Sequence, residues 1–599
     1  MAMTTRVIIS IEGDSIDEFA HLKIIQKTNA HHKFSFLETF NKGFSADALD
    51  KMQNYIGRSV HIRITPLETL EEGEMVFKGV ITEANLIRSG GDAGGIAISG
   101  YSPTVYMDGV PNTKNFIGES LPQVIHEATR NHAGKVKFSK DVGEEPLDYT
   151  VQYKESDFSF LRRLARKKGH WFYYNGEELI FGKPKSRHIN LQYGKTLEKF
   201  NIGAGTAPLG FKYTGYDPTS ADTQYAKSTE TGYQSRGLTQ AMMDISRKIY
   251  PEGESNLLYH HPLREGNARS HLVDRVKTQL HGRVSRLVTV NGASEDTRFR
   301  IGDVISIKEP KYGLTNNPKD LVQEKFYGSY YVISVTHSCD GNGNYSNEFT
   351  AVPEAIEAPP YTDVLTPPLA ETQPAEVIDN NDPKGLGRVR VKFHWDYESP
   401  WIRMVQPHGG GNKGFYFIPE KGEEVMVAFE GGNAEKPYIT GTMYNGNQKS
   451  GYATANNDFK VIHTRSGHII KLDDTNGSEN ITITDKNKNT IFIDTAGNNI
   501  DITANETMTL NARNLLLNIQ EDMNVQVGNN KTESISQDHS VTATNTLEII
   551  SGNKTVQVSE TFEQSSSEAT MVTLSGDMNI KGAGLATFQG GSDVKVSKG

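Results

Sequence analysis

One segment of the sequence carries the spacing of an acyl-transfer site. His408-Gly409-Gly410-Gly411 matches the loop that places backbone N–H groups around an oxyanion in lipases. That chemistry also needs a serine on a G-x-S-x-G turn, and the sequence contains none. We therefore interpret the glycine run as a turn between strands.

A second segment begins like a calcium-binding loop. Asp340 opens the run D-G-N-G-N, whose oxygens are the ligands that calcium prefers. The sixth position of such a loop needs glycine and the twelfth needs a bidentate glutamate, but Tyr345 and Ala351 stand there. We predict a hairpin turn at this point.

A basic cluster could contact phosphate groups. Its members fall within one predicted helix and are Arg162, Arg163, Arg166, Lys167 and Lys168. The apolar residues of that helix share its other face, and the chain carries a net charge of −10. We therefore favour a solvated face, with contact to a neighbouring subunit as the functional alternative.

The histidine pairs His31-His32 and His260-His261 lack a carboxylate or cysteine at ligand spacing. Neighbours on a strand point to opposite faces, so neither pair can readily hold one metal ion. Gly385-Leu-Gly387-Arg-Val-Arg390 lacks the third glycine of a dinucleotide loop. We predict no catalytic residue, no cofactor, no metal site and no nucleic-acid partner.

The composition describes a folded chain of several domains. Its 599 residues are 36% hydrophobic and 23% charged, with 56 glycines that suit β-structure with tight turns. The single cysteine, Cys339, excludes an intrachain disulfide. Charges at Glu12 and Asp14 interrupt the N-terminal apolar run, so we expect a strand there and no signal peptide.

The first 365 residues are rich in alternating strands, such as residues 7–11 and 59–64. Three helices are predicted. Ser120 caps one, with Gln123 completing a capping box, Ser156 caps the second, which ends at Gly169, and the third covers residues 267–280. A proline-rich linker follows at residues 366–380, the end of a longer proline-rich stretch that begins at residue 357.

Residues 381–450 are predicted to form a small closed barrel of the OB type. Strands at residues 388–393, 401–405 and 424–429 are separated by glycine-rich and Asn-Gly turns.

Residues 451–599 carry a short repeat of alternating strands. The apolar anchors Ile493, Ile502, Leu510, Ile519, Val527 and Ile535 are spaced by 9, 8, 9, 8 and 8 residues. A lone ribbon with one narrow apolar face is marginal in water, so the face needs a partner. We predict three identical chains wound into a triple-stranded β-helix, and a single-chain β-helix is the competing geometry. The predicted core at the trimer interface consists of Ile481, Ile483, Ile491, Ile493, Ile500, Ile502, Met508, Leu510, Ile519, Val525 and Val527.

The barrel segment resembles the OB module of the VgrG family, the spikes of type VI secretion systems. The resemblance lies in four ordered blocks: GRVRVKFHWD from Gly387, PWIRMVQ from Pro400, GFYFIPEKGEEVMVAFEGG from Gly414, and PYITGTMYNG from Pro437. Its signature residues are Gly387, Trp395, Trp401, Pro419, Gly422, Gly441 and Tyr444. The regions before and after the module are similar to that family's hub and spike.

The resemblance implies a mainly β homotrimer with three parts. These are a phage-hub-like domain at 1–365 (two barrel-like subdomains with a few helices), an OB module at 381–450 and a β-helix spike at 451–599. Members of the family resemble a fusion of a phage baseplate hub and tail spike. The implied partners are hexameric tube rings at the hub, baseplate components, a PAAR-type cap at the tip (residues 582–599), and an effector or effector–cap fusion.

The function implied is puncture of target membranes, with only transient membrane contact, and delivery of non-covalently bound effectors. The protein would lie in the cytoplasm before firing and leave the cell afterwards. An extracellular phage-tail-like injector or a phage tail would show the same features. A cell-wall hydrolase is disfavoured because no catalytic constellation is present, and a trimeric adhesin would not need a hub or an OB module.

Overall fold

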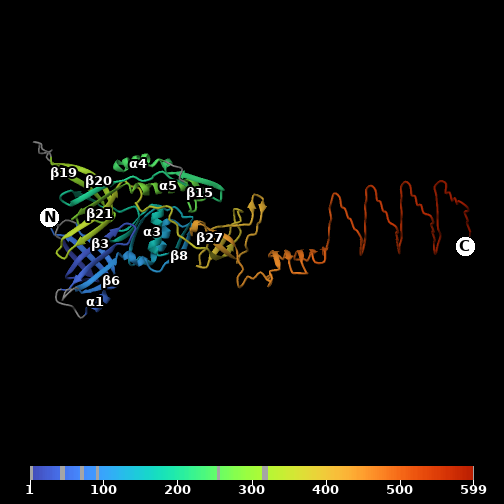
Figure 1. Cartoon of the computed structure of the whole chain (residues 1–599), viewed down its shortest axis with the longest axis horizontal. Helices are drawn as coiled ribbons and strands as arrows, with labels where there is room; N and C mark the ends of the chain where they lie inside the picture. The colour runs from blue at the N-terminus through green and yellow to red at the C-terminus, as the bar shows by residue number, and fades with distance from the viewer. Residues whose placement is uncertain are drawn as a thin grey trace. The chain divides into compact units, whose positions relative to one another are not determined.

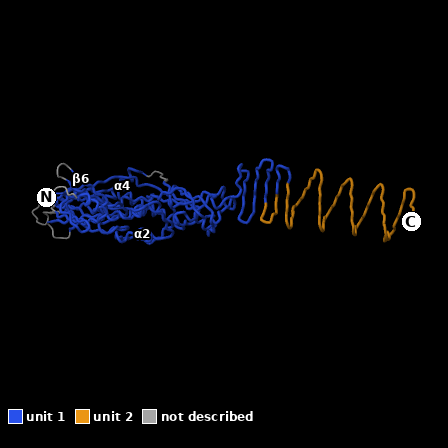
Figure 2. Tube along the Cα trace, turned by 90° about the horizontal axis from the view of Figure 1, so that it is seen from below, with its two compact units in different colours: residues 1–483, 492–499 blue, residues 484–491, 500–599 orange. Residues whose placement is uncertain are grey.

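The computed structural model describes residues 5–40, 47–67, 73–88, 94–251, 256–312 and 322–597. These residues are mainly β-structure, as the alternation predicts. The chain divides into two units, residues 1–483 with 492–499 and residues 484–491 with 500–599 (Figure 2). No helix in the described ranges is long and apolar enough to cross a membrane.

The helices lie in the hub region (Figure 1). They are α1 (Ala48–Tyr55), α2 (Leu121–Thr129), α3 (Asp157–Lys168), α4 (Gly237–Ile249) and α5 (Ala268–Val284), with short 3-10 turns at η1 (Pro103–Met107), η2 (Arg130–His132) and η3 (Ser228–Thr231). A further 3-10 turn, η4 (Glu430–Gly432), lies in the OB module. The three predicted helices correspond to α2, α3 and α5. The capping box of Ser120 and Gln123 is present, and Ser156 Oγ accepts the N–H of Ser159 at 3.1 Å. Gly169 ends α3 in the left-handed conformation, at φ 71°.

A sheet of thirteen strands runs through the hub. Its strands are β1 (Thr5–Ile11), β2 (Asp14–Ser15), β3 (Phe19–Lys27), β4 (Lys33–Thr39), β5 (Ser59–Pro66), β6 (Met75–Arg88), β7 (Gly94–Tyr101), β13 (His188–Gln192), β14 (Leu197–Ala204), β18 (Val288–Ser294), β19 (Val304–Tyr312), β20 (Val322–Cys339) and β21 (Tyr345–Pro353). The long strand β20 joins two halves. It pairs with β21 along one edge, and along the other edge it pairs first with β19 and then with β3.

Each half of this sheet has its own apolar core. One core contains Phe34, Phe77 and their neighbours, and the other contains Phe299, Val332 and Phe349. Smaller sheets cover the rest of the hub. They consist of β8 (Asn112–Ile117) with β10 (Tyr149–Glu155); β9 (Lys137–Asp141), β11 (Trp171–Tyr174) and β12 (Glu178–Gly182); and β15 (Lys212–Asp217), β16 (Asp222–Lys227) and β17 (Asn256–Leu258).

The proline-rich segment corrects one prediction, because it is not a free linker. Ala358, Thr362 and Val364 are buried, and Val364 N–H donates to Gln279 Oε1 of α5 at 2.9 Å. Residues 373–379 form a strand, β22, within the range predicted as linker. The prolines lower the number of backbone N–H groups that a packed, extended segment must satisfy.

The OB module is a five-stranded sheet in the order β23-β22-β27-β28-β24. A bridge between Val389 and Ile402, with N···O distances of 3.0 and 2.9 Å, links the two ends of this order and closes the barrel. Its strands are β22 (Gln373–Asp379), β23 (Arg390–Phe393), β24 (Arg403–Met404), β27 (Glu424–Phe429) and β28 (Pro437–Thr442), with a hairpin of β25 (Gly409–Gly410) and β26 (Lys413–Gly414) outside it.

The C-terminal segment contains five short strands, and the described residues after the fifth strand form no further strand. The strands are β29 (Phe459–His463), β30 (Ile469–Asp473), β31 (Asn480–Thr484), β32 (Thr490–Asp494) and β33 (Asn499–Thr503). Described residues from 504 to 597 form no helix and no strand within the chain, and they run as repeated passes of exposed backbone (Figure 2). The strands predicted around Met508 and Val525 are therefore not paired within one chain. Residues 598 and 599 of the predicted tip lie outside the described ranges.

Candidate functional site

The signature residues of the OB module build its barrel and its turns. Trp395 stacks on Phe393 at a centroid distance of 4.8 Å, and its Nε1–H donates to Gln373 Oε1 at 2.9 Å. Gly387 and Gly422 have φ values of 68° and 87°, which glycine adopts without strain.

The other signature residues differ in exposure. Pro419 is buried and Trp401 is half-buried, and Gly441 lies in β28 opposite Met426. Tyr444, in contrast, is 76% exposed. The signature therefore combines structural positions with one aromatic side chain that the barrel leaves uncovered.

The OB module also exposes apolar side chains on its outer surface. Val405, Phe415, Tyr416 and Phe417 are 53%, 48%, 74% and 53% exposed. Tyr416 lies near Gly387, since a Cβ built there would meet Tyr416 Cε2 at 3.6 Å. Grouped apolar exposure of this kind marks interaction surfaces.

The predicted spike core is exposed in the single chain. Ile481 and Ile493 are half-buried, and the exposed members are Ile483, Ile491, Ile500, Ile502, Met508, Leu510, Ile519, Val525 and Val527. Neighbouring apolar residues such as Leu516 and Leu547 are more than four-fifths exposed. The burial of these side chains in a trimer stays a prediction.

The basic cluster on α3 corrects another prediction. Arg162 is exposed as expected, but Arg163 and Lys167 are buried. Arg163 makes two hydrogen bonds of 2.8 Å to Glu155, and Lys167 pairs with Glu435 of the OB module. This face of the helix contacts another part of the same chain and not solvent, and spacing alone could not reveal a partner 268 residues away.

Neither histidine pair lies on a strand, and the two members of each pair differ in burial. His261 is buried and contacts Glu435, whereas His260 is exposed. His32 is fully buried, while His31 stacks on Phe158 and contacts Asp108 Oδ2 at 2.7 Å. One histidine of each pair therefore contacts a carboxylate that is distant in the sequence, Asp108 for His31 and Glu435 for His261. Among the described residues, no three His, Cys, Asp or Glu side chains are arranged to hold a metal ion.

The two predicted turns are confirmed. Asp340 Oδ1 accepts the N–H groups of Asn342 and Asn344 at 2.9 Å each, which closes the hairpin between β20 and β21. The glycine run after His408 forms the β25–β26 hairpin, where Phe415 N–H donates to the His408 carbonyl at 2.9 Å.

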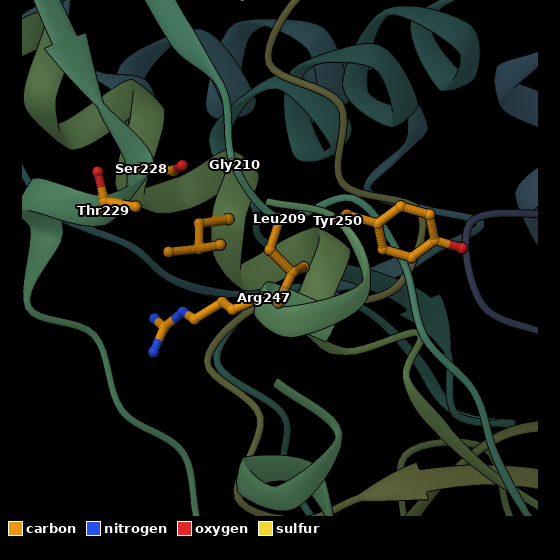
Figure 3. Close-up of a pocket in the computed structure, with 7 residues that line it drawn as sticks. Leu209, Gly210, Ser228, Thr229, Arg247 and Tyr250 are labelled. Atoms are coloured by element: carbon orange, nitrogen blue, oxygen red, sulfur yellow. The ribbon is translucent and has the colours of Figure 1, made fainter. Parts of the chain in front are cut away.

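Two hollows in the described residues differ in their lining. Figure 3 shows one beside α4, of about 110 Å³, lined by Leu209, Gly210, Ser228, Thr229, Arg247, Tyr250 and Leu280. This lining contains one cation and neither a carboxylate nor a histidine. An open groove of about 670 Å³ lies between α2 and Tyr397 of the OB module, and its walls carry both signs of charge, including Lys114 and Glu127.

The comparisons with known proteins fit this architecture. Residues 39–343, half of the chain, match the phage tail baseplate hub (GPD) family, and residues 373–444 match the OB domain of type VI secretion system and phage-baseplate injectors. The chain belongs to the phage tail baseplate hub family. The second match begins at Gln373, where β22 begins, so it includes the strand that the prolines concealed.

The curated relatives of this hub protein are VgrG proteins, which confirms the predicted resemblance. It is 26% identical over 460 residues to the type VI secretion system spike protein VgrG1a of Pseudomonas aeruginosa, covering 68% of this chain and 67% of that protein. It is 25% identical to VgrG1c of the same organism, covering 61% and 54%. The chain thus spans about half to two thirds of the length of these relatives.

One solved structure similar to this hub protein is a chain of the lidded Francisella PdpA–VgrG complex. The TM-score is 0.55, with 8% sequence identity and coverage of 84% of this chain and 80% of that chain. This likeness supports the fold.

Proposed function

We propose that the protein is the trimeric hub and spike of a contractile injection machine of the type VI secretion kind. In this role it sits at the tip of the tube, punctures the target membrane and carries non-covalently bound effectors. The family match supports the hub, and the closed barrel of residues 373–444 supports the module between hub and spike.

The observation that carries the proposal is the absence of a core in described residues 504–597. Apolar side chains recur every eight or nine residues there, yet they are exposed and their backbone is unpaired within the chain. Burying large apolar side chains contributes about 1.5–3 kcal/mol each, so such a segment needs partner chains. Two further copies satisfy both the apolar faces and the backbone donors.

The partners proposed are those of such a machine: hexameric tube rings and baseplate components at the hub, and a PAAR-type cap with its effector at the tip. The solved complex of a Francisella VgrG protein with PdpA supports the presence of partners in general. The proposed location is the cytoplasm before firing and outside the cell afterwards. We propose a mechanical and not an enzymatic role.

The test is docking of the purified full chain onto reconstituted tube rings, viewed by electron microscopy. We expect one trimer at one end of each tube. Hydrolysis of purified peptidoglycan without ring binding would favour a cell-wall hydrolase, and absence of both would favour an adhesin. Expulsion by a sheath in the cytoplasm would favour a type VI secretion system. Assembly into a virion would favour a phage tail.

A further inference from the structure

A loop of the OB module inserts into the hub just after η4. Asn433, Ala434 and Glu435 are buried there, and the Glu435 side chain is 0% exposed. Asn433 Nδ2–H donates to the His260 carbonyl at 2.7 Å, and Ala434 packs in one apolar cluster with residues of β10. The loop therefore seats both polar and apolar groups inside the hub.

The Glu435 carboxylate meets three nitrogen-bearing side chains of the hub. Lys167 Nζ pairs with Oε2, His261 Nδ1 lies 3.3 Å from the same oxygen, and Arg163 Nη1 lies 3.7 Å from Oε1. Arg163 and Lys167 are four residues apart on α3, which places them on one face of the helix. Burial alone would raise the pKa of Glu435, but Lys167, His261 and Arg163 outweigh it and hold the pKa well below its usual range.

The three hub side chains around Glu435 (Arg163, Lys167 and His261) form a socket that would lack a negative counter-charge without this loop. Arg163 has a hub partner, Glu155, whereas the only ion pair of Lys167 in the described part of the chain is with Glu435. Arg275 adds positive charge nearby. Burial and Arg275 lower the pKa of Lys168 to about 7, and burial, Arg163 and Arg275 lower the pKa of Lys167, which Glu435 opposes. A buried ammonium without a partner is strongly unfavourable. The OB module thus supplies the negative charge that the hub socket lacks.

We propose that Glu435 is an electrostatic latch that holds the OB module in one orientation on the hub, with Arg163, Lys167 and His261 as its socket. Secondary contacts act at the same junction: Asn115 Nδ2–H donates to the Glu398 carbonyl at 2.7 Å, and Tyr153 Oη–H to Glu371 Oε2 at 3.0 Å. Two ion pairs also cross the junction, Lys154 with Glu371 and Lys384 with Glu265, but their side chains are exposed and water can satisfy them. Glu435 is buried, so its loss is the one that leaves a buried charge without a partner.

The experiment measures the distance between spin labels on the hub and the OB module in the full chain, with labels at the exposed positions Lys78 and Thr440 and with Cys339 replaced. Labelled chains are assembled with an excess of unlabelled chains, so that a trimer carries at most one labelled chain, and the wild-type protein should then give one narrow distance distribution. E435Q, which keeps the shape and removes the charge, should broaden it. E430Q is the matched control, because Glu430 lies in the same loop and is 40% exposed, and its one ion pair among the described residues is with Lys436.

Two further variants separate a latch from simple packing. K167M/E435Q should narrow the distribution again relative to E435Q, because the unpaired ammonium is gone. E435D keeps the charge and should retain the narrow distribution, and it serves as the readout if E435Q does not fold. Any one of three results would overturn the proposal. These are a narrow distance distribution for E435Q, a broader distribution for K167M/E435Q than for E435Q, and a broad distribution for E435D.

Discussion

Placing a lysine at Ile502 tests whether the apolar face of the C-terminal segment is a contact between chains. Ile502 lies in β33 and is 58% exposed in the single chain. Full burial of an isoleucine contributes about 1.5–3 kcal/mol, so covering the remaining surface contributes about 1–2 kcal/mol per chain and about 3–5 kcal/mol per trimer. I502K removes this and brings three ammonium groups toward one axis.

The neighbouring residue provides the control. Thr503 is also exposed, but successive side chains of a strand point to opposite faces, so T503K should place its charge in solvent. The assay is sedimentation velocity across a urea series. We expect I502K to dissociate at clearly lower urea than the wild-type protein, with T503K unchanged. Equal effects of the two lysines would refute the assignment of faces.

Two further predictions concern stability. Six histidines have pKa values that are lowered, mainly by burial, to about 3 or 4: His32, His261, His281 and His337 are buried, and His170 and His271 are half-buried. The unfolded chain therefore binds protons at these histidines below pH 6.5, where the folded protein does not. The contribution of these histidines to the unfolding free energy should be fully present above pH 6.5. It should fall toward pH 4 by about 1.4 kcal/mol per pH unit for each histidine. Guanidinium midpoints at pH 7.5 and 5.5 check this, and an unchanged midpoint contradicts it. In the OB barrel, F393A removes a side chain that is 1% exposed and should cost about 3–5 kcal/mol in the unfolding free energy of the module, whereas K392A, at the surface, should cost little. Equal losses in denaturant titrations would count against this core.

Short-range patterns in the sequence were enough to predict the two helices that carry N-terminal caps. Ser120 with Gln123 and Ser156 with Gly169 are short-range patterns, and both helices begin where these residues predict. Helix α4 begins at Gly237 without a side-chain cap, so no comparable signal marks it. The strand β22 was hidden by Pro374, since proline rarely occupies the middle of a sheet.

Long-range polar contacts were beyond reach of spacing arguments. Glu435 and His261 are 174 residues apart, and nothing near either one indicates a buried contact. The alternation after Ile493 was visible in the sequence, but the described chain supplies no partner for its apolar face. The repeat therefore predicted the strands up to β33, and the strands that it predicts beyond them are unpaired within the described chain.

The mass of the native assembly tests the central claim most directly. Native mass spectrometry of the full chain should give about 199 kDa, three times the 66.3 kDa of one chain. Hydrogen exchange on the same sample should show protected amides in residues 504–597, because strands in a trimer pair their backbone. A stable 66.3 kDa monomer with those amides protected would contradict the account.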